Sequence, residues 1–209
     1  MSKLMHSKLI FIIFLILTIL SCSNSKKPNY ASDLENCLTE NDIILINNAV
    51  SSFEKKILKK YKNQTIGNAY LSYLKDLNEQ NIDSDFVLSI ETKNILDDLK
   101  KEGTYAKIWS ELEIILHERG RNLEGTKVID IYTLNPNGIF LNCLIEKTKN
   151  ELILEHLLEK KEIPETSYGF AVRDFSERLT ENDFEENLNR MTIAIVYYYE
   201  LYSLFEYLK

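Results

Sequence analysis

The chain has 209 residues, of which 44% are hydrophobic and 27% are charged, and its formal net charge is −7. This composition is typical of a globular protein, and the length suffices for one domain whose core needs no metal or disulfide framework. Residues 1–21 contain Lys3 and Lys8 and no acid, so the rest of the chain carries −9. An acidic body argues against nucleic acid as a partner, because nucleic-acid binding requires a dense cationic surface.

Residues 1–21 have the three parts of an export signal peptide. Lys3 and Lys8 form a basic start, residues 9–20 form an apolar run, and the small residue Ser21 follows. The run of 12 residues is shorter than a transmembrane helix, which needs about 20 apolar residues. We therefore favour a cleaved signal over the alternative, an uncleaved anchor helix.

The end of this segment, residues 19–22, reads Ile-Leu-Ser-Cys and resembles the lipobox of bacterial lipoproteins. Leu20 is larger than the residue usually found at its position. The resemblance implies that the Cys22 thiol receives a diacylglyceryl group, that cleavage occurs before Cys22, and that the new amino group can be acylated, as with palmitate. It further implies a membrane as a partner and the bacterial cell envelope as the location, on either the inner or the outer membrane.

Residues 22–32 are polar, contain Pro28, and predict a tether between the lipid and the folded domain. Residues 33–209 contain few turn-forming residues, and their apolar side chains recur at helical spacing. We therefore predict an all-α fold, a single helical bundle of about six to eight helices. In chain order, the expected helical segments are residues 43–61, 66–77, 95–99, 105–116, 140–144, 152–158, 168–175 and 183–208.

The pentapeptide Leu-Thr-Glu-Asn-Asp occurs at residues 38–42 and again at residues 179–183. The sequences that follow the two copies do not align, so we interpret both as helix starts of the capping-box type rather than as an internal repeat. Residues 127–134 have β-like character, but we expect them to be too short and solitary to form a sheet. Asn135 and Pro136 then predict a helix start, with Asn135 as the cap.

The final predicted helix becomes apolar on nearly all sides from Met191 onward. Such a helix is usually buried in the centre of a bundle. A docking surface for a partner and membrane insertion are the alternatives, and Glu200 and Glu206 argue against insertion.

We find no catalytic, cofactor or metal-binding motif, and we expect no cofactor and no metal. Neither His117 nor His156 has the spacing of a zinc or di-iron site. Cys37 and Cys143 could form a disulfide in an oxidising compartment, or Cys143 could remain a buried thiol. Lysines crowd residues 55–62, and we interpret them as a solvated helix face rather than as a site for an anionic lipid or an acidic partner.

The sequence therefore favours a lipid-anchored envelope protein that is not an enzyme and that binds an unknown protein; an immunity-type protein that neutralises a toxin is one version. The alternative is a small-ligand or enzymatic cleft between helices. In that case His117, His156, Arg119 and Arg121 would converge with several tyrosines. A structure distinguishes the two interpretations, because such a cleft requires these residues to meet.

Overall fold

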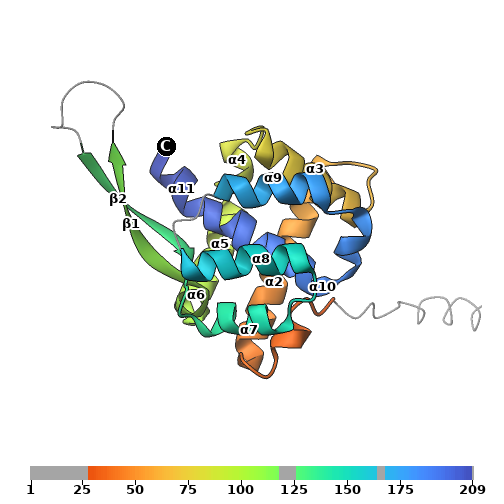
Figure 1. The fold of residues 1–209 in the computed structure, drawn as a ribbon, viewed down its shortest axis with the longest axis horizontal. Coiled ribbons are helices and arrows are strands. Elements are labelled where there is room, and N and C mark those ends of the chain that lie inside the picture. The colour runs from red at the N-terminus through yellow and green to blue at the C-terminus, as the bar shows by residue number, and fades with distance from the viewer. Residues whose placement is uncertain (1–27, 118–125, 164–167, 209) are drawn as a thin grey trace, which may run out of the picture.

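The computed structural model describes residues 28–117, 126–163 and 168–208, and it confirms the all-α prediction (Figure 1). A bundle of helices makes up the body, and a two-stranded hairpin extends from one side of it. Among the described residues, no helix has both the length and the apolar character needed to span a bilayer. In chain order the elements are η1 (Ser32–Leu34), α2 (Glu40–Lys60), α3 (Ile66–Asn78), α4 (Ser84–Val87), α5 (Ile90–Lys101), α6 (Thr104–Ile108), β1 (Trp109–His117), β2 (Thr126–Leu134), α7 (Ile139–Lys147), α8 (Glu151–Glu162), α9 (Tyr168–Arg178), η2 (Glu181–Glu185), α10 (Asn187–Ala194), η3 (Ile195–Tyr199) and α11 (Glu200–Leu208).

The last three elements, α10, η3 and α11, follow one another without a break and form the buried helix that the sequence predicts. Every residue from 191 to 199 is buried. The middle segment, η3, is a π-helix, and its three consecutive tyrosines contact different parts of the bundle. The Tyr197 ring lies 5.1 Å from that of Phe175 on α9, whereas the Tyr199 hydroxyl donates to a carbonyl of α2 at 2.8 Å.

An aromatic cluster packs α2 and α3 against this central helix. The Phe53 ring lies 5.5 Å from that of Tyr70, 5.0 Å from that of Tyr73 and 4.6 Å from that of Tyr198. The Tyr73 hydroxyl also donates to the carbonyl of Tyr197 at 2.7 Å. Buried Tyr side chains need such partners because an unmade hydrogen bond in the core costs about 1–3 kcal/mol.

The N-terminal boundary of the domain lies earlier than the predicted residue 33. Tyr30 and Ala31 are buried, and the Tyr30 hydroxyl donates to Glu54 at 2.7 Å. Tyr30 and Ala31, which the sequence analysis assigned to the tether, therefore belong to the folded domain. Residues 1–27, which include the predicted signal and Cys22, lie outside the described residues.

Both predicted capping boxes are present. Thr39 caps α2 with Asp42, and Thr180 caps η2 with Asp183, each through reciprocal hydrogen bonds. The second copy begins the short 3₁₀-helix η2, which starts at Glu181, and α10 starts only at Asn187. The same pentapeptide thus starts helices of different type, in agreement with local capping rather than duplication.

The prediction of a helix over residues 105–116 is wrong beyond Ile108. The chain leaves α6 there and forms β1, which pairs antiparallel with β2 from Trp109 opposite Leu134 to His117 opposite Thr126. The statement that residues 127–134 are too solitary for a sheet is also wrong, because their partner had been assigned to a helix. Nine paired residues in each strand outweigh the helical spacing of the apolar side chains in β1.

The predicted cap of the next helix is wrong as well. The Asn135 side chain accepts the N–H of Asn137 in a local turn, and the N-cap of α7 is Gly138. Pro136 therefore lies in the connection and not in the first turn of the helix. The two interpretations use the same Asn chemistry, since an Asn side chain closes a turn as readily as it caps a helix.

Asp42 joins the start of α2 to α6. One carboxylate oxygen accepts from the Thr104 hydroxyl at 2.7 Å, and the other accepts from Lys107 at 2.6 Å and from the Thr39 N–H at 2.9 Å. Burial alone would raise the pKa of Asp42, but these hydrogen bonds outweigh burial and lower the pKa to about 2. The folded state therefore favours the carboxylate.

We expect Asp42→Asn to lower the free energy of unfolding by about 1–3 kcal/mol at neutral pH, because the buried partners lose a charged acceptor. The stability that the carboxylate provides is complete above about pH 5 and declines as the pH falls through 3.8, the ordinary value, to about 2. Urea unfolding at several pH values tests this, with the exposed Asp98→Asn as control. Equal stability losses in the two variants would contradict it.

Candidate functional site

The structure does not bring the two histidines of the chain body together. His156 is buried on α8, where its Nδ1 lies 3.1 Å from a Glu159 oxygen and its ring lies 5.0 Å from that of Phe175. His117 is the last residue of β1, at the end of the hairpin that lies away from the bundle (Figure 1). Arg119 and Arg121 lie outside the described residues. His156 therefore packs α8 against α9, far from His117.

Acidic, histidine and cysteine side chains also form no metal-binding group of three within residues 28–117, 126–163 and 168–208. His156 contacts two acidic side chains: its Nδ1 is 3.1 Å from Glu159, and its Nε2 is 3.4 Å from Asp174.

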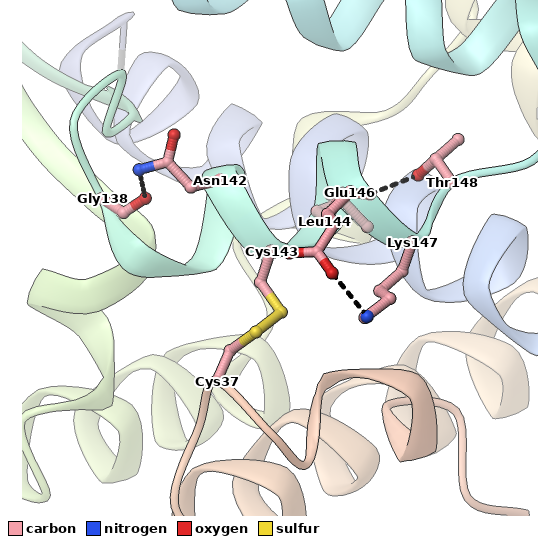
Figure 2. The surroundings of a disulfide bond; sticks show 8 residues. All are labelled: Cys37, Gly138, Asn142, Cys143, Leu144, Glu146, Lys147 and Thr148. Carbon is pink, nitrogen blue, oxygen red and sulfur yellow. Dashed lines mark hydrogen bonds and ion pairs between the residues drawn. A yellow bond between two sulfur atoms is a disulfide. The ribbon is translucent and has the colours of Figure 1, made fainter.

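Cys37 and Cys143 form a disulfide bond (Figure 2). Their Cα atoms are 6.2 Å apart, within the usual range for a disulfide. Cys37 lies on the segment before α2, and Cys143 lies on α7, so the bond joins the N-terminal part of the domain to its second half. The two residues are separated by 106 positions, and closing so long a loop restricts the unfolded chain strongly.

The candidate binding site is a groove at the foot of the hairpin, which we call the tyrosine groove. It lies between α5, α6, β2 and α11 and has a volume of about 230 Å³. Tyrosine side chains make up most of its wall, together with one lysine and one glutamate. The lining residues are Leu96, Lys100, Tyr105, Tyr132, Tyr199, Tyr202, Ser203, Glu206 and Tyr207.

Ring contacts fix one wall of the tyrosine groove. The rings of Tyr105 and Tyr132 meet edge to face at 5.2 Å, and Tyr105 also packs against Trp109 at 4.9 Å. The Lys100 ammonium lies 4.9 Å from the centre of the Tyr105 ring and 5.7 Å from that of Tyr132. Burial raises the pKa of Tyr105, so its hydroxyl stays neutral and can donate a hydrogen bond at physiological pH.

Side chains of α11 hold β2 beside the groove. Ser203 accepts the N–H of Tyr132 at 3.2 Å, and Glu200 accepts the N–H of Leu134 at 3.1 Å. These two amides point away from β1, so α11 covers the outer edge of β2 at this end. Glu200 also pairs with Lys160 of α8 at 2.7 Å. Polar contacts thereby fix the hairpin to α11, and the ion pair of Glu200 joins α11 to α8.

Sequence reasoning missed this groove because its lining comes from elements far apart in the chain, and because β1, the partner of β2, had been assigned to a helix. Tyr105 and Tyr132 are 27 positions apart and meet only because β1 and β2 pair. A usable signal was present in the sequence: two segments rich in apolar residues lie on either side of Gly120 and Gly125. That arrangement is typical of a hairpin.

No protein-family model, curated protein or solved structure matches this chain. The geometry of the described residues is therefore the basis for the functional proposals below.

We expect the double variant Cys37→Ala/Cys143→Ala to unfold with a free energy about 4–5 kcal/mol lower than the oxidised protein, the value that chain entropy gives for a loop of this length. Urea unfolding of the variant and of the protein with and without reductant measures this difference. Cys22→Ser is the matched control and should leave the unfolding midpoint unchanged. Free alkylation of both thiols in the native, unreduced protein would contradict the pairing.

Proposed function

We propose that this protein is a lipid-anchored component of a bacterial cell envelope that binds another protein through the tyrosine groove. The groove is the observation that carries the binding part of the proposal. The lipobox pattern at residues 19–22 and the Cys37–Cys143 disulfide support a location in the cell envelope.

Two features support an exported, lipid-anchored protein. Residues 19–22 have the lipobox pattern ending at Cys22, and two or three acyl chains at one cysteine would hold the protein on a membrane almost permanently. The Cys37–Cys143 disulfide is typical of proteins in oxidising compartments, which include the space outside the bacterial cytoplasm. The anchor and the disulfide thus agree on the same location.

The size and chemistry of the tyrosine groove favour a protein as its ligand. A volume of about 230 Å³ is smaller than the pockets of roughly 300–1,000 Å³ that enclose small molecules. It suits one or two side chains of a partner. Tyrosines are enriched in protein interfaces because they offer a large apolar surface and a hydroxyl at a low cost in entropy. Lys100 and Glu206 add one charge of each sign, which favours a polar partner segment over a purely apolar one.

The outer edge of β1 pairs with no further strand among the described residues. The N–H groups of Tyr132 and Leu134 donate to α11 and not to β1. The residues opposite them on β1, Glu111 and Trp109, therefore form the non-hydrogen-bonded pairs of the antiparallel ladder. The backbone of these partners therefore points away from β2. The Trp109 N–H already donates to the Tyr105 carbonyl, so the open position on this edge is Glu111. Within the described residues β1 pairs with β2 alone. An extended segment of a partner could add to this edge by backbone hydrogen bonds while a neighbouring side chain enters the groove.

We expect palmitate supplied to bacteria that express the protein to label it covalently, and Cys22→Ser to abolish the label. The reason is that the acyl chains attach through the Cys22 thiol and its amino group. Autoradiography after metabolic labelling measures the result. Cys37→Ala/Cys143→Ala is the control and should retain the label, whereas label surviving in Cys22→Ser would refute the anchor.

We expect Tyr202→Ala and Lys100→Glu each to reduce recovery of the partner at least tenfold when the protein is captured from detergent-solubilised cells. Each change removes or reverses a side chain of the groove without opening the core. Phe170→Ala, which removes an exposed aromatic side chain on α9, is the control and should capture the partner normally. A partner that all variants recover equally would contradict the assignment of the site.

A further inference from the structure

A second groove, which we call the lysine groove, lies between the end of α2 and the junction of α4 with α5. Its volume is about 520 Å³, which falls within the range of small-ligand pockets. Four lysines and one glutamate line it, beside an aromatic ring and a hydroxyl. The residues are Lys55, Lys56, Lys59, Lys60, Phe86, Ser89 and Glu91.

Lys56 does not belong to a solvated helix face, contrary to the interpretation of residues 55–62 from the sequence. Its ammonium, which has three N–H donors, lies within hydrogen-bonding distance of four oxygens: the Phe86 carbonyl at 2.5 Å and the hydroxyls of Tyr198 at 2.6 Å, Ser89 at 2.7 Å and Thr92 at 2.9 Å. Burial lowers its pKa to about 8, so the group remains largely charged at neutral pH. Lys56 therefore fixes a positive charge and the Ser89 hydroxyl at the floor of the groove.

Lys55 and Lys59 add two positive charges that form no ion pair with an acidic side chain among the described residues. Lys55 and Lys59 are exposed, lie one turn apart on α2, and make no ion pair within the part of the chain that the structure describes. Lys60 differs, since it pairs with Asp76 at 3.0 Å. The one acid of the groove, Glu91, accepts from Ser52 at 2.8 Å.

The start of α5 adds a further positive contribution. Ser89 is the N-cap of this 12-residue helix, and both Ser89 and Glu91 line the groove. The N-terminal end of a helix carries a partial positive charge and exposes backbone N–H groups. Ammonium groups, a hydroxyl and a helix N-terminus are the donors that proteins use to bind phosphate. Their convergence is notable in a chain whose net charge is −7.

We propose that the lysine groove binds a phosphate group, with Lys55 and Lys59 as its principal charge partners and Ser89 as a hydrogen-bond donor. A phosphate occupies only part of about 520 Å³, so the remaining space takes the organic group that bears it, against the ring of Phe86. The phosphate could come from a soluble phosphate monoester or from the diester of a lipid headgroup. This inference does not depend on the tyrosine groove or on its partner.

Isothermal titration of the full chain in an uncharged detergent tests the proposal with three probes: inorganic phosphate, glycerol 3-phosphate and glycerophosphoglycerol, the deacylated headgroup of phosphatidylglycerol. We expect at least one organic probe to bind, with an affinity that falls as the salt concentration rises. We expect Lys55→Gln/Lys59→Gln to weaken this binding at least tenfold. The control, Lys75→Gln/Lys101→Gln, removes the same charge from exposed lysines elsewhere and should bind normally.

The pattern across the probes identifies the source of the phosphate. Tighter binding of glycerol 3-phosphate supports a soluble monoester, and binding of glycerophosphoglycerol at least as tight supports a lipid headgroup. The proposal is overturned if no probe binds, or if the control double variant weakens binding as much as Lys55→Gln/Lys59→Gln. It is also overturned if that double variant, shown to be folded by circular dichroism, binds as well as the unchanged protein.

Discussion

The burial of residues 191–199, at the centre of the helix that α10, η3 and α11 form, is the constraint on which the rest of the structure depends. These residues are all buried, so other elements must cover this stretch of the helix on every side. The π-helical segment η3 places three tyrosines in succession in this interior. Each hydroxyl or ring then needs its own partner, and the partners belong to different helices. A bundle built in this way has one centre rather than two separable layers.

Both candidate sites depend on this helix. The Tyr198 hydroxyl forms hydrogen bonds with Lys56 and with Thr92 at the floor of the lysine groove. Tyr199, Tyr202 and Ser203 of the same helix form one wall of the tyrosine groove. Glu200 connects the same helix to β2 and to Lys160. A buried helix thus positions polar groups at two surfaces. π-Helical segments are frequent at functional sites because they displace side chains from the regular helical spacing.

The sequence was informative wherever the signal is local. Amphipathic spacing identified α2, α3 and α8, the repeated pentapeptide identified two capping boxes, and the apolar C-terminal segment identified the central helix. It failed at β1, whose side chains have helical spacing but whose pairing with β2 is a contact between distant residues. It also missed both grooves, since Lys56 contacts Tyr198 across 142 positions and no local pattern reports such a distance.

Native-state hydrogen exchange tests the central role of this helix most directly. If the helix organises the bundle, the amides of residues 193–201 exchange only through global unfolding and are the slowest in the domain. Their exchange free energies should then equal the free energy of unfolding obtained from urea. Faster exchange in these residues than in α5 or α9, through a local opening that leaves the other helices protected, would contradict the account.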